Sequence, residues 1–131
     1  MIEYQWRGAY DDAEPNALHA RCFDHEIEEV PWHTRLDRYS LGWVCARDGG
    51  DLVGFVNVPW DGGAHAFLLD TMVAPSHRRH GVGVELVAHA SAQARAAGCA
   101  WLHVDFEPHL RPFYVDGCGF RPTDAGLIRL R

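Results

Sequence analysis

The chain has 131 residues, enough for one domain but too few for a second independent core. Hydrophobic residues make up 47% and charged residues 23%, which is typical of a globular rather than a disordered chain. The net charge of −6 argues against a general nucleic-acid binder, because such proteins need a broad cationic surface. No apolar run approaches the roughly 20 residues of a membrane-spanning helix, so we expect no membrane partner.

The cysteines indicate a reducing compartment. The 4 cysteines are scattered along the chain and form no CxxC pair. The chain opens with Met1-Ile2-Glu3 and shows neither a basic nor an apolar leader segment. We therefore expect free thiols in a soluble, cytoplasmic protein.

The first forty residues predict one strand and two helices. Residues 2–6 alternate as a strand does. A helix is predicted after the pair Asp11-Asp12, one of which we expect to cap it, and it runs to about Cys22. Trp32 and Leu36 have the spacing of anchors on a second, short helix.

Three strands joined by glycine turns follow, over residues 41–47, 52–59 and 64–73. Asp-Gly-Gly-Asp separates the first two strands, and Trp-Asp-Gly-Gly separates the second from the third. Turns this short join antiparallel neighbours. The middle of the chain therefore predicts an antiparallel meander.

A long helix is predicted over residues 81–97 and closed by Gly98. We expect its small and medium-sized residues to lie on the sheet, namely Val84, Val87, Ala88, Ser91 and Ala94. A strand over 101–106, a helical stretch over 110–116 and a last strand over 127–130 complete the predicted elements. This order predicts a single α/β domain, residues 1–131, with a mixed central sheet: a β meander followed by a β-α-β unit.

The strongest chemical signal lies where a strand ends, a basic loop turns and two glycines open the long helix. The first N–H groups of a helix lack partners and its dipole is positive there, so this end binds anions. Gly81 and Gly83 would let a phosphate approach the backbone, and Arg78 and Arg79 would add charge-assisted hydrogen bonds. The alternative is an ordinary glycine-rich helix start. Two nucleotide-binding motifs do not match. The chain lacks the third glycine of the dinucleotide-binding fingerprint, and it contains no Gly-Lys-Ser/Thr of a P-loop.

The wider pattern Val73-x-Pro75-x-x-Arg78-x-x-Gly81-x-Gly83 resembles the acetyl-CoA signature of the GNAT superfamily of N-acetyltransferases, Arg/Gln-x-x-Gly-x-Gly/Ala. The resemblance extends over about residues 41 to 120. It implies a GNAT-like fold, acetyl-CoA as cosubstrate and no metal. It also implies that backbone groups of Met72 and Val73 pair with the pantetheine arm of coenzyme A, while Arg78 shapes the loop. The backbone N–H groups that would then bind the pyrophosphate belong to Arg79, His80, Gly81, Val82 and Gly83.

The pair Phe113-Tyr114 followed by Gly119-Phe120 resembles the Phe-Tyr-x-x-x-Gly-Phe element of the same family. The resemblance implies that Tyr114 lies near the thioester sulfur as general acid. The spacing is one residue longer here, so either Gly117 absorbs the extra residue or Tyr114 is displaced. A core tyrosine with a satisfied hydroxyl is the alternative.

The general base stays open between two places in the sequence. Asp70 lies two residues before Met72, where several GNAT enzymes carry an acidic residue near the acceptor amine. The other candidate is a stripe of alternating polar residues, His103, Asp105, Glu107 and His109. Three interpretations of this stripe stay open. It is the solvent-facing side of an ordinary strand, or Asp105 and Glu107 form a wall of the acceptor pocket, or the stripe binds a divalent metal. Trp60 is a further candidate for the acceptor pocket, with core packing as the alternative.

Our first hypothesis is an N-acetyltransferase that moves acetyl from acetyl-CoA to a primary amine by direct attack. The surplus of carboxylates favours a cationic amine on a small molecule or peptide, and many proteins of the resembled family form homodimers. The alternative is a non-catalytic acyl-CoA-binding or sensing module, motivated by the longer Tyr114–Gly119 spacing and by the missing asparagine that the family often has after the fifth strand. A nucleotide-binding domain unrelated to coenzyme A is a third possibility.

Overall fold

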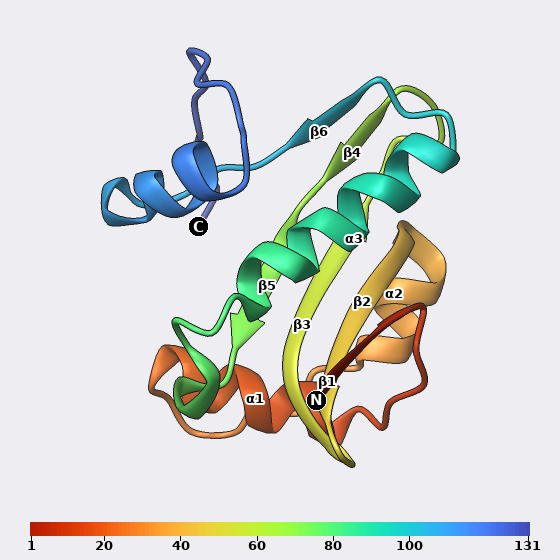
Figure 1. The fold of residues 1–131 in the computed structure, drawn as a ribbon. Helices are drawn as coiled ribbons and strands as arrows, with labels where there is room; N and C mark the ends of the chain where they lie inside the picture. The colour runs from red at the N-terminus through yellow and green to blue at the C-terminus, as the bar shows by residue number, and fades with distance from the viewer.

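The computed structural model describes residues 1–131 as two sheets and the helices that cover them (Figure 1). The main sheet is antiparallel, in the order β1-β2-β3-β5. Its strands are β1 (Ile2–Trp6), β2 (Ser40–Asp48), β3 (Asp51–Pro59) and β5 (Leu69–Val73). The second sheet pairs β4 (His65–Phe67) in parallel with β6 (Trp101–His103). The predicted meander is therefore confirmed as β2, β3 and β5.

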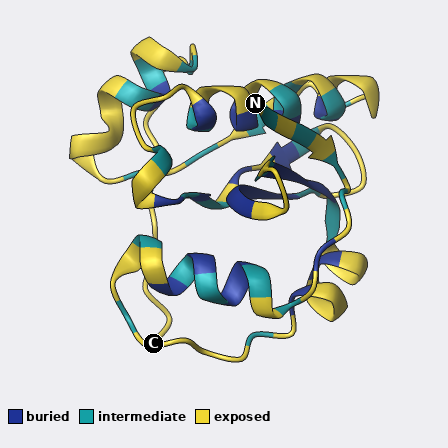
Figure 2. Ribbon diagram, turned by 60° about the horizontal axis from the view of Figure 1, so that its bottom comes forward, coloured by how far each residue is buried: buried dark blue, intermediate teal, exposed yellow.

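Helices cover both faces of the main sheet. They are α1 (Ala13–Phe23), α2 (Trp32–Tyr39) and α3 (Val82–Ala96), followed by a 3-10 turn (Pro108–Leu110) and a π-helix (Pro112–Gly117). Neighbouring residues of β3 show the two faces, because side chains alternate along a strand. The ring of Phe55 lies 5.7 Å from that of Trp32 in α2, whereas a Cβ on Gly54 would lie 3.1 Å from Leu86 in α3. Figure 2 shows the buried residues on the central strands and on the helix faces turned towards them.

The strand predicted over residues 64–73 is divided at Leu68. Its first part, β4, pairs with β6, and the N–H of Leu68 donates to the carbonyl oxygen of His103 at 2.9 Å. Its second part, β5, pairs with β3. The strand predicted to reach Phe106 ends at His103, and the chain then runs away from β5 (Figure 1). β5 is therefore left with one backbone edge that no strand pairs.

Two further predictions at the ends of the chain are wrong. Residues 118–131 form no strand, and Leu127 and Ile128 are 81% and 86% exposed. Their alternation suits a strand, but no neighbouring strand lies alongside to pair with it. Asp12 does not cap α1, because its carboxylate accepts the backbone N–H of His33 at 3.0 Å instead.

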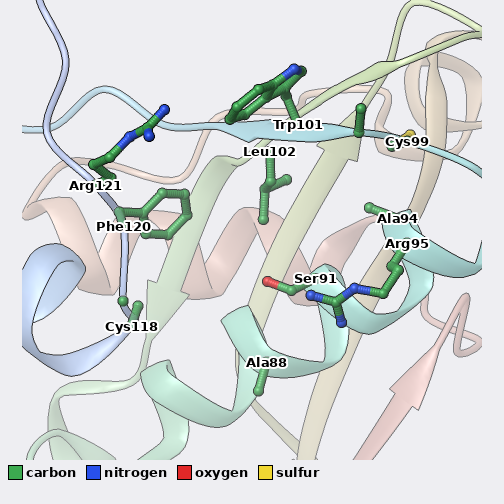
Figure 3. Close-up of a pocket in the computed structure, with 12 residues that line it drawn as sticks. Ala88, Ser91, Ala94, Arg95, Cys99, Trp101, Leu102, Cys118, Phe120 and Arg121 are labelled. Carbon is green, nitrogen blue, oxygen red and sulfur yellow. The ribbon is translucent and has the colours of Figure 1, made fainter.

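The face that α3 buries also differs from the predicted one. The buried residues of α3 are Val82, Leu86, Val87, Ala90 and Ala94, whereas Val84 and Ala88 are exposed. The exposed side of α3 faces a groove of about 570 Å³, and Leu102 and Phe120 lie on the opposite side of this groove (Figure 3). None of the site residues predicted from sequence lines this groove, so the groove is not the candidate site.

The buried face of α3 can be tested with two truncations. Leu86 is fully buried, so Leu86→Ala should lower the free energy of unfolding by about 2–5 kcal/mol through lost contacts and a cavity. Val84→Ala, on the exposed side, should change it by less than about 0.5 kcal/mol. Urea denaturation measures both values. Equal losses at the two positions would contradict the placement of α3.

Candidate functional site

The N-terminus of α3 presents free backbone donors. Gly81 precedes the helix with φ 80° and ψ 2°, and no side chain caps this end. The first bond into the helix runs from the N–H of Glu85 to the carbonyl oxygen of Gly81 at 3.1 Å. The N–H groups of Val82, Gly83 and Val84 therefore have no acceptor within the helix. Together with the helix dipole, they can bind an anion.

Gly81 keeps the space in front of these donors open. Its positive φ favours glycine, and a Cβ there would meet nothing within 4 Å. The side chains of Arg79 and His80 are exposed beside it. Arg79 also has a positive φ of 65°, unusual for a residue with a Cβ, which turns the loop sharply before the helix. The loop thus offers backbone N–H groups and the cationic side chain of Arg79, without a side chain at Gly81 in the way.

Arg78 holds the loop rather than facing the free donors. Its Nε donates to the carbonyl oxygen of Val73 at 3.3 Å, and its Nη2 donates to that of Cys22 at 3.2 Å. The Cys22 thiol donates to the same Val73 oxygen at 3.2 Å. Arg78 therefore ties the end of α1 to the end of β5, which agrees with the loop-shaping role that the resemblance implies.

His77 anchors the other side of the loop. Its Nε2 lies 2.8 Å from the carboxylate of Asp48, at the β2–β3 hairpin, and its Nδ1 lies 2.8 Å from the hydroxyl of Ser76. The hydrogen bond from His77 lowers the pKa of Asp48. With Arg78 and His77 both bonded to protein partners, the side chains of Arg79 and His80 are left exposed without such partners.

The free edge of β5 offers Thr71 and Val73 for backbone pairing. The N–H of Ala74 donates to the carbonyl oxygen of Val53 at 2.8 Å. Met72, two residues before Ala74, lies opposite Phe55 of β3. Backbone groups alternate along an antiparallel strand, so those of Met72 point to β3 and those of its two neighbours point away. The Met72 side chain is buried as well, at 1% exposure. The Val73 carbonyl oxygen is already held by Arg78 and Cys22. The geometry therefore favours Thr71 and the N–H of Val73, not Met72, as partners of an extended ligand.

Tyr114 lies in the π-helix that follows β6. The N–H of Cys118 donates to the carbonyl oxygen of Phe113 at 2.9 Å, a bond across five residues. This wider turn takes up the extra residue between Tyr114 and Gly119, and Gly119 follows it with φ 84°. The sequence suggested Gly117 for that role, but Gly117 has no positive φ.

The ring of Tyr114 is buried among aromatic residues near β5. It stacks on Phe106 with 5.0 Å between centroids, and the edges of Phe113 and Phe120 pack around it. Burial raises the pKa of the Tyr114 hydroxyl, and a hydrogen bond with the Thr71 side chain partly offsets that rise. The hydroxyl therefore keeps its proton at neutral pH, beside the free edge of β5.

Asp70 faces the side of the main sheet that α1 and α2 cover. The pairing of β5 with β3 contains one extra residue at this point, and Asp70 has a φ of 57°. Such a bulge re-aims a side chain. The Asp70 carboxylate accepts from Asn57 Nδ2 at 3.3 Å and lies 3.8 Å from the guanidinium of Arg35. Asp70 is thus held in place by two partners.

A cavity of about 120 Å³ lies beside Asp70, between α1, α2 and the loop that joins them. Its lining residues are Asn16, His19, His25, Glu28, Val30, Trp32, Arg35 and Asp70. Asn16 shapes this cavity, because its side chain bonds both backbone groups of Val30 at 3.2 Å and accepts from Trp32 Nε1 at 2.7 Å. Arg35 lies over the Trp32 ring at 4.6 Å.

The sequence analysis missed most of this cavity. Asn16 and His19 are three residues apart on α1, so their shared face could have been found from helical spacing. His25 could not, because its position depends on the path of the α1–α2 loop. Trp60, Asp105 and Glu107, predicted for the acceptor pocket, lie outside this cavity, so that role stays a prediction.

The polar stripe after β6 behaves as a solvent-facing side. Asp105 and Glu107 are exposed, whereas Leu102, Val104 and Phe106 between them are partly buried. No group of three or more His, Cys, Asp or Glu side chains is placed to hold a metal ion. No helix combines the length and the apolar character needed to cross a bilayer.

Comparison with known proteins identifies the family. Residues 4–120 match the sequence profile of the acetyltransferase (GNAT) family. The chain belongs to this family of acyltransferases. The streptothricin acetyltransferase of Streptomyces lavendulae is 33% identical over 98 residues, which are 71% of this chain and 52% of that protein. The chain therefore spans about half the length of this GNAT relative.

Solved structures show the same fold. A GNAT-family acetyltransferase of Streptococcus pneumoniae superposes with a TM-score of 0.78 at 20% identity, with 100% of both chains covered. AAC(6′)-Iy, solved with the bisubstrate analog CoA-S-monomethyl-acetylneamine, has a TM-score of 0.78 at 16% identity and covers 100% of this chain and 98% of its own. The mixed α/β architecture is therefore the GNAT fold, and the family uses acetyl-CoA as cosubstrate.

The packing of the π-helix on α3 can be tested by a double-mutant cycle. A Cβ at Gly83 would lie 2.9 Å from the Phe113 ring, which is too close. Gly83→Ala should therefore lower the free energy of unfolding by about 1–3 kcal/mol. In a Phe113→Ala background the clash is gone, and the same change should be neutral or stabilise by up to about 1 kcal/mol. Urea denaturation of the four proteins gives the coupling, and additive effects would contradict this contact.

Proposed function

We propose that this GNAT protein transfers an acetyl group from acetyl-CoA to a primary amine by direct attack. The observation that carries the proposal is the position of three features around β5. The uncapped start of α3 and the free edge of β5 lie on one continuous segment, and Tyr114 lies beside Thr71 on that edge. An anion site, an extended groove wall and a proton donor are the parts that binding and opening a CoA thioester require.

The residues present fit coenzyme A. Its pyrophosphate carries charges that the N–H groups of Val82, Gly83 and Val84 can bind, and the absence of a Cβ at Gly81 leaves room for it. Arg79 supplies a local positive charge on a protein with a net charge of −6, and His80 adds an imidazole beside it. The pantetheine arm, with its amide groups, suits the outward backbone groups of Thr71 and the N–H of Val73 as an added strand would.

In the reaction, acetyl-CoA supplies an acetyl group activated as a thioester. The proposed role of Tyr114 is to give its proton to the departing sulfur, because its raised pKa keeps the hydroxyl protonated at neutral pH. A backbone N–H on the free edge of β5 can donate to the carbonyl oxygen while negative charge develops there. The incoming amine must reach the same edge without its ammonium proton.

The cavity beside Asp70 is the proposed acceptor site. Asp70 and Glu28 give it carboxylates, and Trp32 gives it an aromatic wall, which suits a cationic amine. The similar streptothricin acetyltransferase is named for a small molecule, and this favours a small-molecule amine over a peptide.

Steady-state release of the CoA thiol with a panel of primary amines tests the function. Wild-type protein should turn over at least one cationic amine. Tyr114→Phe should lower kcat by about 10²–10⁴-fold, because it removes the proton donor while keeping the ring. Tyr39→Phe serves as the matched control, since Tyr39 is 61% exposed at the end of α2, and it should leave kcat unchanged.

Two outcomes would contradict this proposal. Full kcat in Tyr114→Phe across the pH range would remove Tyr114 as the acid. Tight binding of acetyl-CoA without turnover of any amine would favour the non-catalytic acyl-CoA-binding module instead.

A further inference from the structure

We propose that His19, oriented by His25, is the base that takes the proton from the acceptor ammonium in the cavity beside Asp70. The inference rests on the proposed acetyl transfer and names the group that the transfer still lacks. It replaces Asp70, the base suggested by sequence position, with a histidine pair that only the fold brings together.

Hydrogen bonds fix the protons of this pair. Nδ1 of His25 contacts the backbone carbonyl oxygen of Glu26, and a carbonyl can only accept, so His25 carries its proton on Nδ1. Nε2 of neutral His25 must then be an acceptor. It lies 2.6 Å from Nδ1 of His19, which must therefore donate. The remaining nitrogen, Nε2 of neutral His19, is left with a free lone pair.

Packing holds the His19 ring in this orientation. The ring lies 4.6 Å from that of Phe23 and 6.3 Å from that of Trp32, measured between centroids. Trp32 is itself locked by its bond to Asn16, and Asn16 also holds Val30, at the far end of the α1–α2 loop that carries His25. The pair is therefore braced from α1, from α2 and from the loop.

The charges around His19 suit a base that works at neutral pH. Burial lowers its pKa most, and His25 and Arg35 lower it further, whereas Asp70 and Glu28 act in the opposite direction. His19 is therefore neutral above its lowered pKa and can accept a proton there. Once it has done so, the carboxylates of Asp70 and Glu28 stabilise the imidazolium.

Asp70 is better suited to hold the substrate than to deprotonate it. Its carboxylate accepts a hydrogen bond from Asn57 and lies 3.8 Å from the Arg35 guanidinium. Both partners favour the charged carboxylate and make it a weaker base. The His19 lone pair has no such competitor, because Nδ1 alone of this ring is engaged.

The proton balance follows directly. The net reaction converts an ammonium and a thioester into an amide, a thiol and one proton. His19 Nε2 takes the first proton from the ammonium and, through its Nδ1, can pass the charge to His25 and so to solvent. The amine nitrogen then forms the bond to the acetyl carbon, and the carbon–sulfur bond breaks. The departing sulfur takes a proton from Tyr114, and the second proton of the nitrogen returns to the Tyr114 oxygen.

The test uses His19→Gln, with His89→Gln as a matched control, because His89 lies on α3 away from the cavity. At pH 7, His19→Gln should lower kcat about 10²–10⁴-fold for a strongly basic amine. The loss should shrink towards wild type at high pH and for acceptor amines of low pKa, which are already neutral. The Kd for acetyl-CoA should not change. His25→Gln should cause a smaller loss, because it removes the orientation of His19 and the relay to solvent but leaves the base itself.

An equal loss at every pH and for every amine would overturn the proposal, since a structural role alone would produce it. Turnover that His19→Gln leaves intact would overturn the His19 assignment but leave the acetyl transfer standing. Absence of turnover by the wild-type protein on any amine would overturn both.

NMR of the histidine rings provides a second test that does not depend on turnover. Nitrogen-15 NMR of the histidine rings should show His19 protonated on Nδ1 and bare on Nε2 at pH 7, with a titration midpoint below the ordinary value of a histidine. A neutral His19 ring protonated on Nε2 instead of Nδ1 would overturn the proposal even in a fully folded protein.

Discussion

The divergence of β6 from β5 is the constraint on which the site depends. β4 and β5 are one stretch of chain, but β6 pairs only with the first part, and the last shared bond runs from Leu68 to His103. Beyond that point, the outward backbone groups of Thr71 and the N–H of Val73 have no strand to pair with, whereas the Val73 carbonyl oxygen accepts from Arg78 and Cys22. Unpaired backbone groups are costly when buried. An extended ligand can take the place of the missing strand. The π-helix that carries Tyr114 follows β6 and packs beside this edge.

The loop between β5 and α3 combines rigidity with free donors. Arg78 donates hydrogen bonds to α1 and β5, and His77 contacts Asp48 at the β2–β3 hairpin, so the loop is held on two sides. The groups that remain free are backbone N–H groups at the start of α3 and the exposed side chains of Arg79 and His80. A fixed array of donors binds an anion with little loss of conformational entropy. The arginine of the signature therefore acts on the shape of the loop.

Local features were predictable from the sequence, and long-range ones were not. The start of α3 follows from Gly81, Gly83 and the basic loop, all within a few residues of one another. The strand expected over 127–130 also rested on a local pattern, but a strand needs a neighbour, and none lies beside it. The cavity at Asp70 depends on how Asn16 holds the α1–α2 loop, a contact across 14 residues that spacing does not reveal. The π-helix could be suspected from the longer Tyr114–Gly119 spacing, but its wide turn is visible only in the backbone bonds.

Calorimetry with acetyl-CoA and with S-acetylpantetheine tests the central claim most directly, because the second ligand lacks the pyrophosphate and the nucleotide. If the start of α3 binds the pyrophosphate, two or more charge-assisted hydrogen bonds are lost with it. Acetyl-CoA should then bind at least about 100-fold more tightly, and salt should weaken its binding. Equal affinities for the two ligands, or no binding of acetyl-CoA by the folded protein, would contradict the account.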